Sequence, residues 1–176
     1  MASGASVDTV SIQSPINALN DKWNLYYHLP DDKNWDLKSY TTIMGDIQTA
    51  EEVIALNESI PDQVIKSCML FLMRKGITPM WEDPRNRTGG CFSYRILNKQ
   101  VPHLWRMLMQ LTCGEILATN AKYNNHINGI TISPKKNFCI VKIWMDTTLY
   151  QDCAIIKSIE NLPVQGCLFK KHEPEF

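Results

Sequence analysis

The amino-acid sequence predicts an α+β fold, in which a mostly antiparallel β-sheet carries helices on one of its faces. Segments with the alternating apolar pattern of strands are interleaved with segments of helical spacing along the 176 residues. Several connections between the strand-like segments are too short for the crossover that parallel strands need. Helices packed on one face of such a sheet leave the other face free for a ligand.

The composition indicates one globular domain. Apolar residues make up 44% of the chain and charged residues 20%, which is typical of a folded protein with a core of its own. Residues 1–18 are small and polar, and we expect them to form a flexible N-terminal tail. Residues 19–176 show no linker and no internal repeat, so we expect them to form a single domain.

The N-terminal part of the predicted domain contains a strand, a loop and a helix. The strand covers residues 22–29, where large apolar side chains alternate on one face, and the loop after it carries Trp35. Thr49 and Glu52 match a capping box, in which each side chain bonds a free amide at the start of a helix. A short helix is therefore expected, with three residues that face inward: Val53, Leu56 and Ile60.

The middle of the chain predicts two strands and a second helix. Residues 68–73 form an apolar run that is typical of a buried strand, and residues 91–97 form another strand after a loop with Trp81. Pro102 is suited to the first turn of a helix. Three leucines then follow at helical spacing: Leu104, Leu108 and Leu111.

The C-terminal part predicts a hairpin, a third helix and a last strand. Residues 127–132 and 138–144 form the two strands of the hairpin, joined by the turn Ser-Pro-Lys-Lys-Asn. Residues 165–171 are suited to the last strand. Between these segments, residues 147–160 are expected to form the third helix, with three residues on one side: Leu149, Cys153 and Ile156.

Charge and cysteine usage exclude several classes of protein. Eighteen basic residues balance eighteen acidic ones, so the chain lacks the broad basic surface that sequence-independent binding to long nucleic acid needs, while a small basic patch stays compatible with this balance. The six cysteines show no C-x-x-C spacing and no histidine at a zinc-like interval. Most lie in apolar runs, which predicts reduced cysteines, a reducing compartment and no metal site. No apolar stretch has the length of a membrane span.

No motif in the chain indicates an enzyme. The G-x-S-x-G elbow, the P-loop and the G-x-G-x-x-G loop are all missing from the sequence. A serine or cysteine nucleophile stays open at this point, because triads assemble in space rather than in sequence. Four histidines have no partners at telling intervals, and we interpret them as solvated or structural: His28, His103, His126 and His172.

Two of the five tryptophans lie in polar, turn-rich loops. Core positions suit Trp23 and Trp105, which fall on a predicted strand and a predicted helix, whereas Trp35 and Trp81 have charged neighbours. Because loops run over the surface, each of these two indoles either anchors its own loop or forms one plate of a stacking clamp. The clamp would suit a flat, cationic ligand, and Glu82 beside the second plate would pair with the ligand's edge.

The strand at residues 138–144 places a cation beside another tryptophan. Strand alternation puts Lys142 and Trp144 on the same face, so this face is not wholly core near its end. The turn before the strand adds Lys135 and Lys136. These lysines either are ordinary solvated residues of a turn or form a pocket for phosphates near one exposed edge.

The most distinctive stretch is Lys-Gly-Ile-Thr-Pro-Met-Trp-Glu-Asp at residues 75–83, followed by Gly89 and Gly90. Further matches in the same order are NDKWNLYY, KNW, LNKQ, LWRMLMQLTCGE and IVKIW. Together they resemble the family of the messenger-RNA cap-binding translation initiation factor 4E, over residues 19–169. The resemblance implies a curved antiparallel sheet, with about three helices on its convex face and a ligand slot on its concave face.

The resemblance also implies a site for the 7-methylguanosine 5′ cap of messenger RNA. Trp35 and Trp81 are expected to sandwich the cationic 7-methylguanine, which adds cation–π attraction to stacking. Glu82 is expected to accept hydrogen bonds from the guanine N1–H and exocyclic amine. Trp144 is expected to lie near the methyl group.

Two departures from the family pattern affect the phosphate-binding residues. Cys91 follows the Gly-Gly pair where the family has an arginine, and Ser133 stands where a second phosphate-binding arginine is expected. We therefore assign the phosphate contacts to the lysines of the hairpin and, by strand parity with Cys91, to one arginine: Lys135, Lys136, Lys142 and Arg95.

The partner surface of the family departs as well. The family binds its scaffold subunit, factor 4G, and inhibitory proteins on the helical face through an exposed tryptophan, and this chain has Ile54 there. The apolar and acidic pair after the tryptophan of the second helix is Arg106 and Met107 here. These changes favour a diverged partner and suit a divergent paralogue or a virus-encoded copy. The expected partner surface comprises Ala50, Ile54, Trp105, Arg106 and Met107.

The leading hypothesis is a cytoplasmic, non-enzymatic protein that recruits capped messenger RNA for translation initiation without a cofactor or a membrane. The changes at Ile54 and Arg106 motivate an alternative, in which the same site serves a translational repressor or a sequestering protein. A nucleotide hydrolase that uses Glu82 or Asp83 ranks below both, because the sequence supplies neither a metal cluster nor a nucleophile for it.

Overall fold

A seven-stranded antiparallel sheet organises residues 16–175, which are the residues that the structure, a computed structural model, describes. The strands are β1 (Ala18–His28), β2 (Thr41–Thr49), β3 (Met69–Arg74), β4 (Gly90–Leu97), β5 (Ile127–Pro134), β6 (Phe138–Met145) and β7 (Leu168–Lys171). Their order in the sheet is β2-β1-β3-β5-β6-β4-β7, and every neighbouring pair is antiparallel. Residues 1–15 of the predicted tail, and residue 176, lie outside the described residues.

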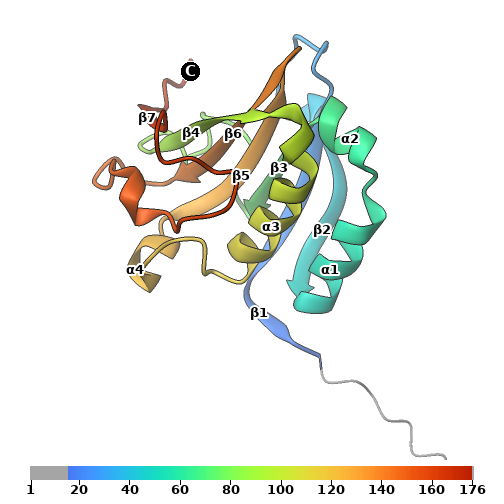
Figure 1. Ribbon diagram of the computed structural model, residues 1–176, viewed down its shortest axis with the longest axis horizontal. Helices are drawn as coiled ribbons and strands as arrows, with labels where there is room; N and C mark the ends of the chain where they lie inside the picture. The colour runs from blue at the N-terminus through green and yellow to red at the C-terminus, as the bar shows by residue number, and fades with distance from the viewer. Residues whose placement is uncertain (1–15, 176) are drawn as a thin grey trace, which may run out of the picture.

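Helices cover one side of this sheet. The three longer ones are α1 (Ala50–Ser59), α2 (Asp62–Ser67) and α3 (Val101–Cys113), and Figure 1 shows them side by side along the curved sheet. A short helix, α4 (Ala121–Asn124), and single 3-10 turns at Leu37–Ser39, Asn98–Gln100 and Cys153–Ile155 lie in the connections. The predicted α+β class with a mostly antiparallel sheet is confirmed.

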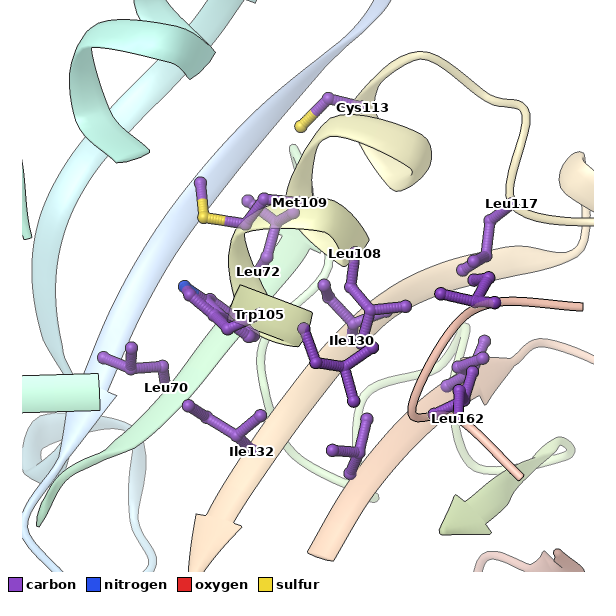
Figure 2. Close-up of a cluster of buried hydrophobic side chains, with 14 of the residues drawn as sticks. Leu70, Leu72, Trp105, Leu108, Met109, Cys113, Leu117, Ile130, Ile132 and Leu162 are labelled. Atoms are coloured by element: carbon purple, nitrogen blue, oxygen red, sulfur yellow. The ribbon is translucent and has the colours of Figure 1, made fainter. Parts of the chain in front are cut away.

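The main hydrophobic core lies between the sheet and these helices. Trp105, at 1% exposed, packs from α3 onto the strands. Figure 2 shows this helix over the apolar side chains of β3 and β5, namely Leu70, Leu72, Ile130 and Ile132. A second, smaller cluster lies on the other face of the sheet and consists of Phe71, Met73, Ile77 and Trp144. Strand alternation therefore separates a core face from a ligand-accessible face, as the pattern of residues 138–144 predicts.

Helix α1 begins as its sequence predicts. The Thr49 hydroxyl accepts a hydrogen bond from the Glu52 amide at 3.2 Å, and the Glu52 carboxylate accepts one from the Thr49 amide at 3.0 Å. This reciprocal pair satisfies two of the amides that the first helical turn leaves free. Val53, Leu56 and Ile60 are buried beneath the helix, as expected from their spacing.

The prediction of a third helix at residues 147–160 is wrong. The one helical turn of this segment is the 3-10 turn at Cys153–Ile155, while Ile156 and Ile159 form isolated β-bridges. Leu149, which was expected on the inner side, is 80% exposed. The Thr147 hydroxyl accepts from the Leu149 amide at 3.2 Å, and the Asp152 carboxylate accepts from the Ala154 amide at 2.9 Å. Such local bonds offer the backbone an alternative to the helical ladder.

A disulfide closes this irregular segment. Cys153 pairs with Cys167, so the prediction of reduced cysteines is wrong for these two residues. The loop returns to the start of β7 and brings the two Cα atoms within 6.6 Å, which suits a disulfide. The other four cysteines are free; burial raises the pKa of Cys113 and of Cys139 to about 12 in each case, which disfavours a reactive thiolate.

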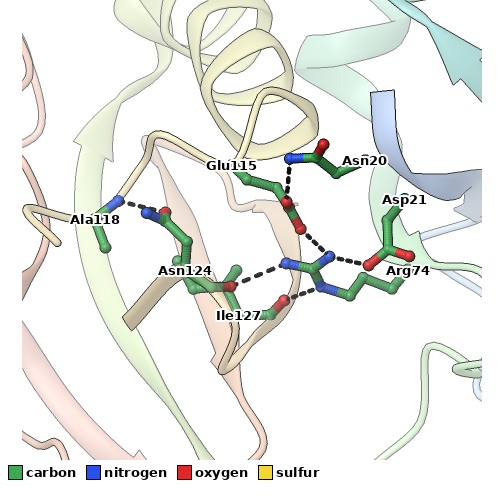
Figure 3. Close-up of polar contacts among 7 residues, drawn as sticks. All are labelled: Asn20, Asp21, Arg74, Glu115, Ala118, Asn124 and Ile127. Atoms are coloured by element: carbon green, nitrogen blue, oxygen red, sulfur yellow. Dashed lines mark hydrogen bonds and ion pairs between the residues drawn. The ribbon is translucent and has the colours of Figure 1, made fainter. Parts of the chain in front are cut away.

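Arg74 fixes the end of β3, directly before the stretch at residues 75–83. It is 5% exposed and ion-pairs with Asp21 and Glu115. Its guanidinium also donates to the carbonyls of Asn124 at 2.9 Å and Ile127 at 2.7 Å (Figure 3). Because one buried cation joins β1, β3, the connection after α3 and the start of β5, the loop that follows β3 leaves from a fixed point.

Residues 16–175 were searched for metal-binding clusters and for membrane-spanning helices. Within residues 16–175, no group of three or more histidine, cysteine, aspartate or glutamate side chains has a geometry that suits a metal ion. Over the same residues, no helix is both long enough and apolar enough to cross a membrane.

Candidate functional site

The face of the sheet that the helices leave uncovered holds a cavity of about 640 Å³. Its floor comes from β3, β5 and β6, and its walls come from the loop after β1 and the loop after β3. Six residues predicted from the sequence line this one cavity: Trp35, Trp81, Glu82, Trp144, Lys135 and Lys142. The structure therefore brings together residues that lie as far apart as 35 and 144 in the sequence.

Trp35 lies on the surface with one face of its ring covered. The indole stacks on the imidazole of His28, with ring centroids 4.2 Å apart and an angle of 2° between the planes. His28 is fully buried, and its Nε2 donates to the carbonyl of Asn34 at 2.8 Å, which fixes the residue before the indole. Trp35 remains 48% exposed, so its ring is not part of the core and can stack on a ligand.

The loop that carries Trp81 is held by its own polar side chains. The Asp83 carboxylate accepts from the Thr78 amide at 2.7 Å, from the Thr78 hydroxyl at 2.8 Å and from the Arg85 amide at 2.9 Å. The Asn86 side chain donates to the Thr78 carbonyl at 3.0 Å and to the Met80 carbonyl at 2.8 Å. These bonds fix the backbone on both sides of Trp81 and Glu82, while Asp83 itself does not line the cavity.

The two glycines after this loop are required by close backbone packing. A Cβ at Gly89 would lie 1.9 Å from the Met145 carbonyl oxygen, and one at Gly90 would lie 2.5 Å from that of Lys170. Both distances are far below van der Waals contact, so a side chain at either position would push β4 away from β6 or β7. The Gly-Gly pair thus lets the start of β4 pack closely against β6 and β7, where the chain leaves the Trp81 loop.

His172, directly after β7, lies behind Trp81. Its ring stacks on that indole at 5.9 Å and 15°, and it contacts Trp144 at 4.9 Å in a tilted arrangement. Its Nδ1 donates to the Asn86 carbonyl at 2.7 Å, so the residue joins β7 to the Trp81 loop. Burial lowers the pKa of His172, and the nearby charge of Lys142 adds to this effect.

Glu82 presents a carboxylate to the cavity. Its Oε1 accepts a hydrogen bond from the backbone amide of Glu175 at 3.2 Å. The pKa of the Tyr40 hydroxyl, which also lines the cavity, is raised first by burial and second by the negative charge of Glu82. The wall around Glu82 is therefore suited to hydrogen-bond donors and to positive charge.

Two buried polar atoms at the cavity have no hydrogen-bond partner within the described part of the chain. They are the Thr131 hydroxyl oxygen and Trp144 Nε1, in side chains that are 2% and 3% exposed. Both atoms are therefore free to bond a polar group that enters the cavity. Lys142 also lines the cavity, and its Nζ lies over the Trp81 ring, 5.7 Å from the ring centroid.

Two of the predicted phosphate-binding residues do not line this cavity. Lys136 is exposed in the turn between β5 and β6, and its carbonyl accepts from the Asn98 side chain at 3.4 Å. Arg95 lies farther along the same face, with its guanidinium 4.0 Å from the centroid of the Phe138 ring. It borders a different cavity, of about 470 Å³, together with residues 158–164.

The predicted partner surface is only partly exposed. Ile54 is 50% exposed, whereas Ala50 and Met107 are half-buried and Trp105 is buried beneath the surface. Arg106 bends back onto α1: its Nε donates to the Asn57 carbonyl at 3.0 Å, and its Nη2 donates to the Ile60 carbonyl at 2.9 Å. It also ion-pairs with Asp62 at 2.8 Å.

Sequence reasoning missed three residues that shape the site, namely His28, Thr131 and His172. The sequence interpretation of His28 and His172 as structural fits their burial, but nothing in their spacing showed that each ring stacks on one of the two loop indoles. Thr131 had a usable signal, because it lies on the strand paired with residues 138–144. Aligning the two strands of that hairpin pairs Thr131 with Lys142, and this pairing would have placed Thr131 on the cavity face.

The fold and the cavity define the class: an α+β protein whose single curved sheet carries helices on one face and a slot with aromatic walls on the other. A family model described as eukaryotic initiation factor 4E matches residues 18–172. The chain belongs to this family.

Relatives agree with this assignment. The eukaryotic translation initiation factor 4E of Eremothecium gossypii is 30% identical over 139 residues, which cover 72% of this chain and 61% of that protein. A homolog of the factor from Acanthamoeba polyphaga mimivirus is 42% identical over 63 residues, 36% of this chain and 23% of that protein. The chain thus spans less than two thirds of these relatives. The structure of Caenorhabditis elegans eIF4E-3 with the 4E-binding protein Mextli and a cap analog matches with a TM-score of 0.67 at 22% identity, over 76% of each chain.

Proposed function

We propose that the chain binds the 7-methylguanosine 5′ cap of messenger RNA in the cavity between Trp35 and Trp81, and that it recruits capped messenger RNA for translation initiation in the cytoplasm. The observation that carries the proposal is that two loop indoles and the Glu82 carboxylate line one cavity. Membership of the initiation factor 4E family supports it, and the C. elegans relative was solved with a cap analog.

The chemistry of 7-methylguanine suits this cavity. Methylation at N7 gives the ring a positive charge, so stacking on an indole gains a cation–π contribution of roughly 0.5–2 kcal/mol. Trp35 and Trp81 supply the two ring faces, each supported from behind by a histidine. Trp144, on the floor, lies near the methyl group in this arrangement. Methylation itself is therefore a feature that the site selects.

Glu82 distinguishes guanine from adenine. Guanine presents two donors on one edge, N1–H and the exocyclic amine, and a carboxylate accepts both with charge-assisted hydrogen bonds. Adenine lacks this pair of donors. The Glu82 carboxylate accepts a hydrogen bond from the Glu175 backbone amide, so it is accessible to an N–H donor.

The hairpin of β5 and β6 supplies the positive charge for the phosphates. Lys135 and Lys142 line the cavity, and lysine ammonium groups hold phosphates as charged donors. Lys136 and Arg95 do not line the cavity, so we assign the main phosphate contacts to Lys135 and Lys142.

The helical face is the proposed partner surface, for a scaffold of the factor 4G type or an inhibitory protein. Ile54 offers an exposed apolar side chain there, next to Ala50 on α1. Arg106 is engaged with the end of α1, so the surface carries a guanidinium where a carboxylate would receive a partner peptide. This contact favours a second candidate function, a cap-binding repressor with altered scaffold binding. Loss of a co-purifying scaffold on Ile54→Asp would favour initiation over repression.

We propose further that the chain is not an enzyme. A nucleotide hydrolase would need a second acidic group or a nucleophile beside Glu82. Asp83 is instead bonded to Thr78 and Arg85 within its own loop, outside the cavity. Incubation with a cap analogue, followed by a search for cleavage products, checks this directly.

Retention on immobilised 7-methyl-GTP tests the function. The wild-type chain should be retained and released by free 7-methyl-GTP but not by GTP. Trp35→Ala and Trp81→Ala should abolish retention while the melting temperature stays within a few degrees, because neither ring belongs to the main core. Leu37→Ala, in the Trp35 loop but outside the cavity, is the matched control and should bind normally. Equal release by GTP would contradict the proposal.

A further inference from the structure

We infer that the outer edge of β4 beside Arg95, Ile96 and Leu97 binds an extended, acidic segment of a partner protein as an added strand. This β4 edge lies outside the cavity proposed for the cap. It is open because the register of β7 with β4 runs only from Gly90 to Ser93, whereas β6 pairs with β4 along its whole length. Among the described strands, the second half of β4 therefore has a neighbour on one side alone.

The chain turns away from the β4 edge just before β7. Gly166 has a φ of 81°, which side-chain-bearing residues rarely adopt, and the Cys167 amide donates to the Val164 carbonyl at 3.2 Å. The Leu162 amide donates to the Ile159 carbonyl at 3.0 Å. Residues 158–167 thus make these backbone bonds among themselves, and a cavity of about 470 Å³ lies between residues 158–164 and the β4 edge.

This cavity follows the edge of the strand rather than one face of the sheet. Arg95, Ile96 and Leu97 all line it, although successive side chains of a strand point to opposite faces. A peptide that enters the cavity therefore meets the side of the β4 backbone, where an added strand would lie.

The antiparallel ladder decides which backbone groups of β4 face the cavity. The His172 amide donates to the carbonyl of Gly89, directly before β4, at 3.0 Å. In an antiparallel pair, every second residue directs both its N–H and its C=O toward the same neighbour. The same alternation directs the backbone groups of Arg95 and Leu97 outward, and no backbone bond from residues 158–167 reaches them. They offer two donors and two acceptors to an extended chain.

Arg95 gives the β4 edge its charge. Its guanidinium lies over the Phe138 ring, 4.0 Å from the ring centroid, and this contact through the flat face leaves the N–H groups in its plane available. None of the residues that line the cavity is acidic, and within residues 16–175 no ion pair joins Arg95 to a carboxylate. A carboxylate of the bound segment is the group that complements this arginine.

Exposed apolar side chains lie around Arg95. Leu97 and Leu168 are 56% and 59% exposed. Leu168 is directly opposite Ser93, so it shares the face on which Ser93, Arg95 and Leu97 alternate along β4. In an added strand, the residues opposite Arg95 and Leu97 are two positions apart and on this same face. The site therefore suits an extended segment with an acidic residue two positions from an apolar one.

A second copy of this chain suits the β4 edge less well. Because the open part is short, pairing two such edges brings the two Arg95 guanidinium groups near each other, and like charges across a strand pair are destabilising. An arginine on an edge strand also discourages pairing with basic chains. These observations favour an acidic segment of another protein, bound by strand addition.

A designed peptide tests the inference on the full chain. The probe is Thr-Val-Thr-Glu-Thr-Val-Thr with blocked termini, and nuclear magnetic resonance of the isotope-labelled protein follows each amide. We expect the Arg95 and Leu97 amides to exchange readily with solvent in the free chain, and to shift and become protected when the peptide binds. Protection of both amides in the free chain would mean that the protein's own residues occupy the edge, which would overturn the inference.

Exchanging the charges tests the role of Arg95. Arg95→Glu should weaken binding of the probe about tenfold, because an attraction is replaced by a repulsion. A peptide with lysine in place of the glutamate should bind this variant as well as the probe binds the wild type. Lys136→Glu makes the same change of charge in the turn between β5 and β6, outside this cavity, and is the matched control. An equal loss in both variants would show that Arg95 does not receive the carboxylate.

Methylating peptide nitrogens tests strand addition without altering the protein. N-methyl groups on the valines and the glutamate remove the N–H groups that face β4 and should abolish binding, whereas N-methyl groups on the inner threonines should be tolerated. Equal binding of the two methylated peptides would overturn the inference. It would also be overturned if the chain self-associated through this edge in sedimentation, or if a short RNA, rather than the peptide, shifted the Arg95 and Leu97 amides.

Discussion

At the scale of the residue, Arg106 illustrates how a single side chain serves the stability of one element and the character of a surface. It leaves α3 and donates to two carbonyls at the end of α1, those of Asn57 and Ile60. The last carbonyls of a helix have no partner within it, and a cation there also opposes the negative end of the helix dipole. The same contact holds the guanidinium on the proposed partner surface.

We predict that Arg106→Ala lowers the free energy of unfolding by about 1–2 kcal/mol. The two carbonyl bonds account for most of this, because the ion pair with Asp62 is largely exposed and such pairs contribute little. Urea denaturation measures the change. His103→Ala, an exposed position one turn earlier in α3, is the control. A change no larger than that of the control would show that α1 does not depend on this contact.

The residues of the slot could be predicted from the sequence to different degrees. The sequence drew attention to Trp35 and Trp81 because large aromatic side chains in charged loops are unusual, and to Glu82 because it directly follows Trp81. All three residues line the cavity. Thr131 and His28 did not stand out, because one threonine or histidine on a strand has many ordinary explanations. Their importance comes from which side chain lies opposite or behind them, and that is known only once the strands are paired.

At the scale of the element, prediction succeeded where the pattern was regular and failed where local bonds or an edge position decided. Strand β2 was missed because only Ile47 of its nine residues is buried, and its pairing with β1 is interrupted by register shifts. An edge strand with one core contact carries almost no alternation. Residues 147–160 had helical spacing of apolar residues, but the Thr147 and Asp152 side chains capture the backbone amides instead.

The disulfide of this segment gives a prediction for the element. Cys153 and Cys167 are separated by 14 positions in the sequence, and closing a loop of that length stabilises a fold by about 3 kcal/mol in the chain-entropy model. Cys167→Ser, or treatment with a reductant, should therefore lower the urea midpoint clearly. Cys68→Ser, which removes a free and half-buried thiol, should change it little.

Thiol counting under denaturing conditions checks the pairing itself. The unreduced wild-type chain should yield four reactive thiols and the reduced chain six, because four of the six cysteines are free. Six thiols without reduction, or a urea midpoint that a reductant leaves unchanged, would contradict the disulfide.

At the scale of the whole molecule, the fold class and the sheet direction were predicted correctly, and so was the division into a core face and a face that is not wholly core. These features depend on strand alternation, which the sequence of β6 shows directly: Cys139, Val141 and Ile143 are buried in the main core, and Lys142 and Trp144 lie on the other face. The order of the strands could not be predicted, because it depends on which distant segments pair.

The stability of the molecule should decrease as the pH falls below about 6.5, in part through His172. Burial lowers the pKa of His172 from its ordinary value of 6.5, while the charge of Glu82 and the bond to Asn86 oppose this shift. The unfolded chain thus binds a proton at a higher pH than the folded chain, so the free energy of unfolding falls as the pH decreases through this window. The full stabilisation is present above the unfolded value.

Urea denaturation between pH 7.5 and pH 5.5 (about one unit on each side of the unfolded pKa) measures this dependence. His172→Phe keeps a ring against Trp81 and removes the titration, so its stability should vary less with pH than that of the wild type. His103→Gln, at an exposed position, should leave the wild-type slope unchanged. Equal slopes for the wild type and His172→Phe would contradict the assignment.

The distribution of the five indoles has a practical consequence. Trp23, Trp105 and Trp144 are at most 3% exposed, whereas Trp35 is 48% exposed and Trp81 lies at the wall of the cavity. Three emitters are thus shielded from small aqueous quenchers such as iodide, and the accessible part of the fluorescence comes from the two that would enclose a base. Loss of iodide quenching on addition of a nucleotide would report occupancy of the slot without any attached dye.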